Sequence, residues 1–281
     1  MAAGPLRDRL RRDRLFQLGL GLVVLLVLAA LLAPWLAPFD PVRGDLRTAY
    51  LLGPGGRFPL GTDSQGRDVL SRVLYGARIS LAVGLVSQTV SVVVGVLLGL
   101  AAGYYGRWVD ALVMRLADVT LAFPTLLLLI AVAAAVRPSL FVVFLVIGLV
   151  GWAGMARLVR GQVLVLKRAE FVVASRALGA LDRRVLLRHL LPNVRGQIII
   201  AATLGIAGAI MAEAALSFVG LGAQPPTPSW GAMVADGRDL LRVAPWVSFA
   251  PGIAIGLAVL GFNLVGDGLR QAYEPRFRHE P

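Results

Sequence analysis

Six long apolar segments recur along this chain and limit what it can fold into. They lie at about 16–36, 79–103, 116–136, 140–156, 198–219 and 247–264. A transmembrane α-helix needs about 20 consecutive apolar residues. Only 16% of the residues are charged, against about 25% in soluble domains. The pattern predicts an all-α, polytopic membrane protein with six transmembrane helices.

The basic residues predict how these spans are oriented. With six spans, 19 of the 28 basic residues fall on one side of the membrane and nine on the other. Basic residues collect in cytoplasmic loops, so both termini are expected in the cytoplasm. A net charge of +12 can indicate nucleic-acid binding. Here the membrane topology accounts for that charge, and no nucleic-acid partner is expected.

This topology divides the chain into five parts. They are a cytoplasmic tail (1–15), a first span (16–36), an extracytoplasmic loop (37–78), a transmembrane domain (79–270) that includes a cytoplasmic loop (157–197), and a second tail (271–281). A cleaved signal peptide is the alternative for the first span. Its apolar stretch is longer than the core of a typical signal peptide, which favours an uncleaved helix.

The loop at 37–78 contains a helix-start pattern. Its first half is rich in Pro and Gly, and residues 62–65 then read TDSQ, a capping-box sequence. Apolar residues follow at helical spacing from Val69 to Ala77. The pattern predicts a short amphipathic helix that lies at the membrane interface and leads into the second span, with a structural role.

The loop at 157–197 is long, polar and basic, with nine basic residues against Glu170 and Asp182. Two short helices are predicted in it. The first covers about 170–178 and ends at Gly179, and the second covers about 182–191 and is ended by Pro192 and Asn193. Arg184 and Arg188 are four residues apart and share a helix face. Periodicity alone leaves two interpretations open, a docking surface for a soluble partner or a loop that binds lipid headgroups.

Glu213 lies about 22 Å into the fifth span at 1.5 Å per residue. A carboxylate inside a span is costly and is a functional candidate. One interpretation places it on a translocation pathway, where it meets a cationic group such as an amino terminus. The other gives it a structural pairing with a backbone donor or a neighbouring subunit. Small residues at 201, 205, 208 and 209 of the same span suit close helix packing, with a neighbouring subunit or within the chain.

The patterns that would indicate catalysis are missing from the sequence. It has no cysteine, which excludes disulfides and thiol chemistry in this chain. It contains no Walker A pattern and no HExxH pair, and both histidines fall in predicted cytoplasmic segments. The expectation is a non-enzymatic chain without a bound metal or cofactor.

Part of the basic loop resembles the EAA loop of binding-protein-dependent ABC transporter permeases. The family pattern is E-A-A, three residues, G, nine residues, I, one residue, L-P. Ala174, Gly179, Leu191 and Pro192 match it. The departures from the pattern are Val173, Ser175 and His189.

Three further stretches resemble one branch of that family, the C-type permeases of dipeptide, oligopeptide and nickel importers. They are residues 59–69 (PLGTDSQGRDV), 212–222 (AEAALSFVGLG) and 263–270 (NLVGDGLR). The likeness covers about residues 58 to 278. Several long motifs in the same order make it specific.

The resemblance implies a type I ABC importer permease in a bacterial or archaeal cytoplasmic membrane. It implies a second homologous permease, two ABC ATPase subunits that bind ATP and Mg, and an extracytoplasmic binding protein that delivers peptides. The loop would couple the chain to the ATPases through Ala174, Ser175, Arg176, Gly179, Asp182, Arg183, Arg184, Arg188, Leu191 and Pro192. Nickel or another small solute is the nearest alternative cargo. A self-sufficient secondary transporter and a membrane scaffold are alternatives from other classes.

Overall fold

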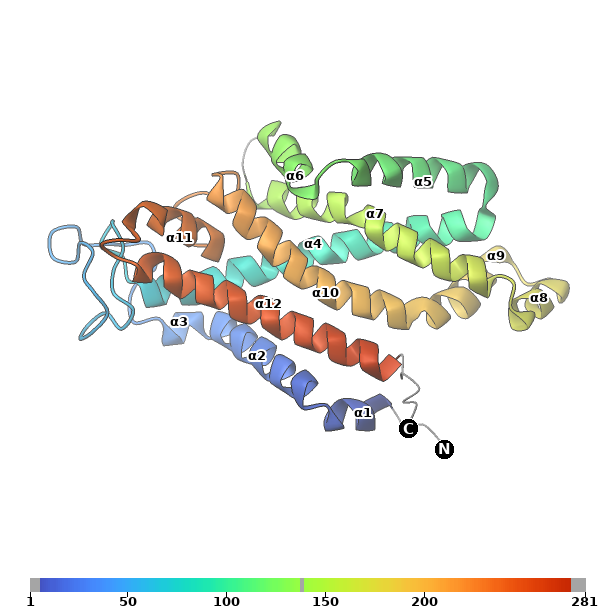
Figure 1. Cartoon of the computed structure of the whole chain (residues 1–281), viewed down its shortest axis with the longest axis horizontal. Helices are drawn as coiled ribbons and strands as arrows, with labels where there is room; N and C mark the ends of the chain where they lie inside the picture. Colours follow the sequence, from blue (N-terminus) through green and yellow to red (C-terminus); the bar gives the residue numbers. More distant parts are fainter. Residues whose placement is uncertain (1–5, 137–138, 274–281) are drawn as a thin grey trace, which may run out of the picture.

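The computed structural model describes residues 6–136 and 139–273 as an elongated helical bundle (Figure 1). Among these residues no strand forms, which confirms the all-α prediction. The long helices are α2 (Arg14–Leu31), α4 (Val69–Tyr105), α7 (Leu140–Leu166), α10 (Leu191–Phe218) and α12 (Trp246–Tyr273). The short elements are α1 (Leu6–Arg12), α3 (Ala33–Leu36), α5 (Arg107–Ala122), α6 (Thr125–Ala134), α8 (Glu170–Ala177), α9 (Asp182–Arg184), the π-helical turn η1 (Val185–Leu190), α11 (Trp230–Gly237) and the 3-10 turn η2 (Arg238–Leu240).

Five helices in the described part of the chain are long and apolar enough to cross a membrane. A sixth span results if α5 and α6 are counted together, and these two helices are bent by 93° where they meet. The break lies at Pro124, the N-cap of α6. A proline inside the apolar segment at 116–136 predicts a kink or a late helix start, because proline lacks an N–H and restricts the residue before it. The predicted start of this segment at residue 116 is too late, since α5 begins at Arg107.

Glycines on one face of α4 allow α7 to pack closely against it. Gly95, Gly99 and Gly103 are spaced four residues apart, as on one helix face. A Cβ atom on Gly99 would lie 2.6 Å from the carbonyl oxygen of Ala156 on α7, and one on Gly103 would lie 2.7 Å from the Cβ of Val163. Such short distances leave no room for a side chain. The α4–α7 pair therefore forms the tightly packed centre of the bundle.

The helix start predicted at residues 62–65 is wrong. Thr62 lies in a loop, where its hydroxyl donates to the carbonyl of Ala49 (2.6 Å) and accepts from the amide of Leu52 (2.8 Å). The helix begins at Val69, with Asp68 as the N-cap that accepts from the amide of Ser71. It continues without a break into the second span. The capping-box pattern fails here because tertiary hydrogen bonds engage the threonine that would cap the helix.

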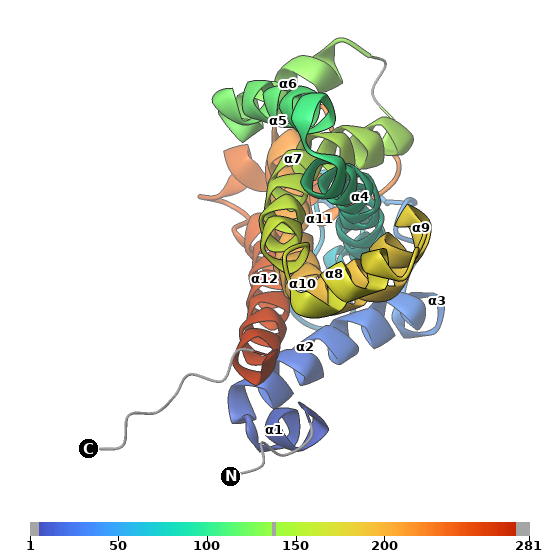
Figure 2. The same cartoon turned by 90° about the vertical axis from the view of Figure 1, so that its right-hand side faces the viewer.

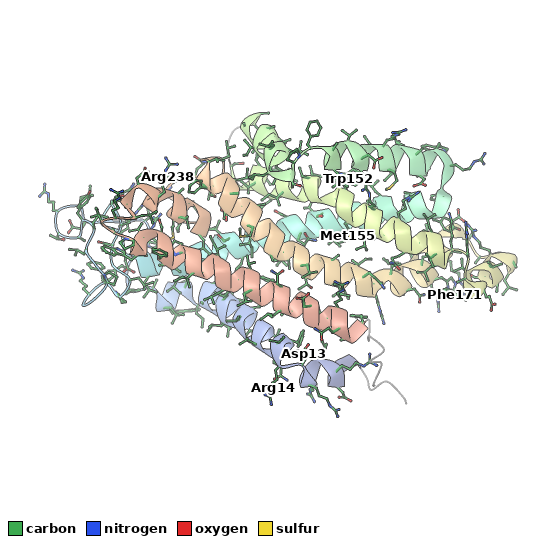
Figure 3. All side chains as sticks on the ribbon, viewed as in Figure 1. Asp13, Arg14, Trp152, Met155, Phe171 and Arg238 are labelled. Atoms are coloured by element: carbon green, nitrogen blue, oxygen red, sulfur yellow. The ribbon has the colours of Figure 1, made fainter. Side chains whose placement is uncertain are left out.

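The predicted cytoplasmic and extracytoplasmic segments lie at opposite ends of the bundle. Toward one end lie the connection between α4 and α5, the segment around α8 and α9, helix α1 and the end of α12 (Figure 1). Toward the other end lie helix α11 and the loop that precedes α4. Phe171 and Arg238 mark the two ends in Figure 3. At the first end, the Arg9 guanidinium donates to the carbonyl oxygen of Ala272 (3.1 Å), which ties α1 to α12.

Candidate functional site

The connection between α7 and α10 protrudes from the bundle as an elbow, defined here as residues 167–190. Helix α8 leads into a turn at residues 178–181, and α9 and η1 lead back to α10. Figure 2 looks along the bundle with this elbow facing the viewer. Gly179 has a φ of 80°, a left-handed conformation that glycine adopts without a Cβ penalty. The predicted end of the first helix at this glycine is confirmed.

The tip of the elbow exposes apolar side chains. Leu178 is 90% exposed and Leu181 is 79% exposed. The predicted loop residues Asp182, Arg183, Arg184 and Arg188 are exposed beside them. Two solvent-exposed leucines next to arginines are typical of an interaction site rather than of an ordinary surface loop.

The inner face of the elbow is buried against the bundle. Val172 on α8 and Val185 and Leu190 on η1 are fully buried. They belong to one apolar cluster with Tyr104 of α4 and Val163 of α7. The elbow therefore has one apolar face toward the bundle and one exposed face, as its sequence pattern predicts.

Polar contacts fasten the elbow to the end of α4. The Tyr104 hydroxyl donates to the Asp182 carboxylate at 2.5 Å. The Arg176 guanidinium lies 4.6 Å from the centroid of the Tyr104 ring, and its Nε donates to the Tyr104 hydroxyl at 3.3 Å. A cation over an aromatic face is attracted by the ring quadrupole. The elbow has an outgoing arm, which is α8, and a returning arm, which is α9 and η1. Both arms thus contact one tyrosine, through the predicted loop residues Arg176 and Asp182.

A second contact joins the two arms directly. The Ser175 hydroxyl on α8 lies 3.1 Å from Nε2 of His189 on η1. Ser175 and His189 are two of the three positions at which the sequence departs from the EAA pattern. In this chain the two departures form a pair, so one hydrogen bond links the outgoing and returning arms.

The predicted helix end at Pro192 and Asn193 is wrong. The helix runs from Asp182 through η1 into α10 and ends only at Phe218. The amide of Leu191 donates five residues back to Leu186, and the Asn193 side chain donates to the carbonyl of His189 (2.6 Å). The backbone therefore passes through a widened turn directly before Pro192 and continues as a helix. Leu191 and Pro192 therefore belong to the base of α10.

Sequence reasoning missed the residues that attach the elbow to α4 and that attach α5 to α7. Lys167 donates to the carbonyl oxygen of Gly103 at 2.8 Å. Arg160 on α7 pairs with Asp110 on α5, with Nη2 2.7 Å from Oδ2. For Tyr104 the sequence predicts only an anchor at the membrane interface. The two partners in each of these contacts come from different helices, and no local pattern reports such contacts.

Glu213 lies in a buried polar cluster where α10 meets α4 and α11. Its side chain is fully buried. Its carboxylate accepts from the hydroxyls of Ser80 (3.2 Å) and Ser217 (2.7 Å), and the Ser80 hydroxyl also accepts from the amide of Trp230 (3.1 Å). These contacts favour the structural interpretation of this carboxylate, because they connect three helices.

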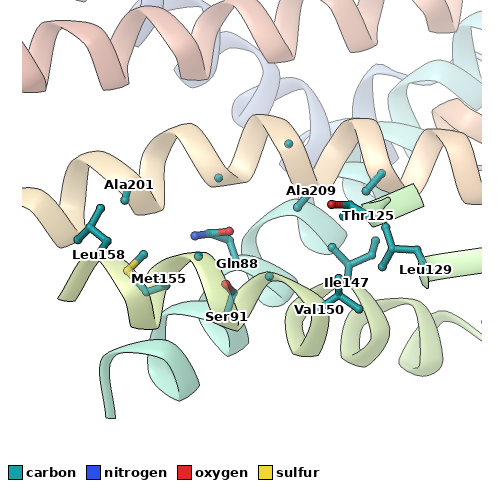
Figure 4. A pocket seen from close by; sticks show the side chains of 15 residues that line it. Gln88, Ser91, Thr125, Leu129, Ile147, Val150, Met155, Leu158, Ala201 and Ala209 are labelled. Atoms are coloured by element: carbon teal, nitrogen blue, oxygen red, sulfur yellow. The ribbon is translucent and has the colours of Figure 1, made fainter. Parts of the chain in front are cut away.

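A cavity of about 440 Å³ opens between α4, α6, α7 and α10. Gln88, Ser91 and Thr125 supply its polar side chains, and the described residues around it include no charged one. Figure 4 shows Gln88 and Ser91 between the ribbons of α7 and α10. The wall on α10 consists of the small residues predicted for close packing, Ala201, Gly205, Gly208 and Ala209, and of Ala212. Glu213 is not part of that wall.

Comparison with solved structures supports the fold. The chain is similar to a structure described as inward facing conformations of the MetNI methionine ABC transporter, with a TM-score of 0.55 and 21% identity. The alignment covers 71% of this chain and 95% of that one. At this identity the likeness establishes the fold alone.

Curated relatives are much more similar in sequence. A dipeptide transport system permease protein of Alkalihalophilus pseudofirmus is 42% identical and covers 99% of this chain and 92% of its own length. A di/tripeptide transport system permease protein of Pseudomonas aeruginosa is 45% identical over 93% of this chain and 88% of its own. A glutathione transport system permease protein of Escherichia coli is 44% identical over 96% of this chain and 89% of its own length.

Two family models match separate parts of the sequence. Residues 6–54 match the N-terminal TM domain of oligopeptide transport permease C. Residues 95–279 match the binding-protein-dependent transport system inner membrane component, and this match includes the whole elbow. The chain therefore belongs to the family of binding-protein-dependent transport system inner membrane components.

Proposed function

We propose that this chain is a permease subunit of an ATP-driven importer that moves short peptides across a bacterial or archaeal cytoplasmic membrane. The elbow carries the proposal, because Leu178 and Leu181 are exposed at its tip while its base is fastened to α4, α7 and α10. A cytoplasmic ATPase subunit docks on this tip. The proposal follows the relatives in its choice of peptides as cargo.

Burial of the two leucines supplies the docking energy. A leucine side chain taken from water into an apolar cleft contributes about 1.5–3 kcal/mol. The neighbouring cations Arg183 and Arg184 add charge pairing with an acidic cleft rim, which steers association more than it tightens it. The ATPase subunits bind ATP and Mg and hydrolyse the ATP, and this chain receives the resulting motion.

The proposal includes an orientation and an assembly. With α5 and α6 counted as one broken span, six spans put the elbow, α1 and the end of α12 on one side of the membrane, and the excess of basic residues on that side supports a cytoplasmic location. Helix α11 and the loop that precedes α4 then lie outside, where a binding protein delivers peptide. A second homologous permease packs in the bilayer beside this one, and the conduit lies between the two.

The docking surface is tested by Leu178→Glu and Leu181→Glu in the chain co-expressed with its partner permease and ATPases. A buried charge in the cleft should weaken ATPase co-purification more than tenfold, since about 1.4 kcal/mol corresponds to each factor of ten. Val243→Glu is the matched control, because Val243 is 69% exposed at the opposite end. Unchanged ATPase recovery in both leucine variants would reject this docking surface.

The orientation is tested with single cysteines, for which the cysteine-free chain is its own blank. In vesicles from cells that lack the partner ATPases, which would cover the tip, Leu178→Cys should react with a membrane-impermeant maleimide only when the vesicles are inverted. Leu46→Cys, at a position 62% exposed in the loop before α4, should react only in intact cells. The reverse labelling pattern would place the elbow outside and end the proposal.

Reconstitution separates the remaining function classes. Proteoliposomes that contain both permeases, both ATPases and the binding protein should take up radiolabelled dialanine when ATP is supplied on the side of the ATPases. Uptake without the ATPases would indicate a secondary transporter. Assembly without uptake under every condition would indicate a scaffold.

A further inference from the structure

A second cavity, of about 460 Å³, lies at the end of the bundle opposite the elbow. Its wall combines the loop before α4, the start of α4, the connection after α10, and α11. The charged residues on this wall are Arg67, Arg72, Asp236 and Arg238. Three arginines therefore face one carboxylate around a space whose volume suits a small ligand.

Two of these arginines are buried, which is rare for this residue type. Arg67 is 5% exposed and Arg72 is 3% exposed. Each has its inner edge paired with Asp63, whose Oδ2 lies 2.7 Å from the Arg67 Nε and 3.5 Å from the Arg72 Nε. Arg72 also donates from Nη1 to the carbonyl oxygen of Pro41 at 3.1 Å. The inner edges of both guanidinium groups are thus held in fixed positions.

The outer edges are only loosely paired. The Nη2 atoms of Arg67 and Arg72 both lie 3.7 Å from one oxygen of Asp236. That distance exceeds a hydrogen bond, and within the described chain neither Nη2 atom donates one. The Asp236 side chain is 49% exposed. Partial burial raises its pKa above the usual value for an aspartate. Asp236 therefore approaches the two arginines without forming a tight pair.

Two convergent guanidinium groups with free N–H donors fit a carboxylate. The planar fork of arginine matches the two oxygens of a carboxylate, and the bond is strongest when both groups are charged and shielded from water. Gln224 and Thr227 add neutral polar groups to the same wall, and Phe218 adds an apolar one. The cavity thus offers cations at one place and mixed surface around it.

We propose that this cavity binds the free terminal carboxylate of a short peptide, with Arg67 and Arg72 as the groups that hold it. The choice of a peptide rests on the proposed function, whereas the choice of a carboxylate rests on the arginines. Asp236 occupies the position that the ligand carboxylate takes and competes with it. Arg238, which is half-exposed, extends the positive wall toward solvent.

The test uses the assembled complex in lipid nanodiscs without the binding protein, and isothermal titration calorimetry with small probes. Dialanine and N-acetyl-dialanine should bind, because both keep the carboxylate. Dialanine amide, which lacks that charge, should bind at least tenfold more weakly. Equal binding of the acid and the amide would overturn the proposal, as would absence of binding by all three.

Two variants distinguish a ligand site from a structural charge cluster. Asp236→Asn removes the competing carboxylate, so dialanine should bind several-fold more tightly. Arg238→Gln should weaken binding, and Arg242→Gln, an exposed arginine outside the cavity wall, should leave it unchanged. A purely structural cluster predicts weaker or unchanged binding in Asp236→Asn, and that result would reject the proposal. These variants avoid the buried Arg67 and Arg72, whose replacement endangers folding.

The experiment is independent of transport. If the proteoliposomes take up no peptide but dialanine binds with the predicted dependence on its carboxylate, the proposed function fails and the site stands. If uptake occurs and the acid and amide bind alike, the site fails and the proposed function stands.

Discussion

The hydroxyl of Tyr104, in the last turn of α4, donates a 2.5 Å hydrogen bond to Asp182, the first residue of the returning arm of the elbow. The two residues are 78 positions apart in the sequence. Helix α4 also carries Gln88 and Ser91, which line the cavity of about 440 Å³. The bond therefore connects that helix to the segment proposed to dock an ATPase. We therefore expect displacement of the elbow to be transmitted to α4 as well as to α7 and α10.

Tyr104→Phe should uncouple the ATPases from the permease without dissociating them. The substitution keeps the ring and the cation–π contact with Arg176. It removes the hydroxyl that donates to Asp182 and accepts from Arg176, and each such bond is worth about 0.5–3 kcal/mol depending on charge. We expect several-fold lower stimulation of ATPase activity by peptide-loaded binding protein, with normal co-purification. Tyr105→Phe, at the exposed neighbour, is the control. Full stimulation in Tyr104→Phe would show that the bond transmits nothing.

Gly179→Val should abolish peptide-stimulated ATPase activity and leave membrane insertion intact. No atom lies within 4 Å of the added Cβ, so the substitution causes no clash. The cost comes from the φ of 80°, because a left-handed conformation costs an L-residue about 1–2 kcal/mol. Gly161→Val on α7, which also meets open space at an ordinary φ, should retain stimulation. Loss of stimulation in both variants would point to bulk rather than to the turn.

Gly99→Ala should destabilise the isolated chain in detergent. Its Cβ would lie 2.6 Å from the carbonyl oxygen of Ala156, and relief of such overpacking costs about 1–3 kcal/mol. A lower midpoint in a thermal unfolding scan is expected. Gly154→Ala on α7 has no atom within 4 Å and should leave the midpoint unchanged or raise it. Equal midpoints for the two variants would contradict close packing of α4 on α7.

Glu213→Ala should reduce complex yield and peptide uptake together. The substitution leaves the hydroxyls of Ser80 and Ser217 without their buried acceptor, at about 1–3 kcal/mol for each unsatisfied group. Glu213→Gln keeps an acceptor oxygen and should lose less of both. Normal yield with lost uptake in Glu213→Gln would instead support a place for this carboxylate on the translocation pathway.

The all-helical fold and five of the six predicted spans could be predicted from the sequence, because each of these needs an uninterrupted apolar run, whereas the sixth is a pair of helices bent by 93°. The turn at Gly179 and the break at Pro124 were also predictable, since both follow from backbone geometry at one residue. Helix starts and ends that depend on tertiary contacts were not. Thr62 bonds to Ala49 and Leu52 instead of capping a helix, and Pro192 lies inside a helix, directly after a π-helical turn.

The candidate site shows the same division. The sequence predicts the elbow and its exposed face, but not how it is fastened. Tyr104 lies in another helix, and the Ser175–His189 pair reads in sequence only as two departures from a pattern. Likewise Asp63, Arg67 and Arg72 read as a helix start and its polar face, whereas Asp236, which completes their cluster, lies on α11, far along the chain.

The continuity of the helix through Pro192 has a mechanical consequence. From Asp182 to Phe218 the backbone is one helix of 37 residues, about 55 Å long at 1.5 Å per residue. We expect it to move as a single body, anchored at one end in the elbow and lining the cavity of about 440 Å³ along its middle. A tilt of about 5° around one tip would sweep the other by about 5 Å over that length. A small rotation of the elbow would then be amplified along the helix, so that the opposite end of the bundle would move furthest.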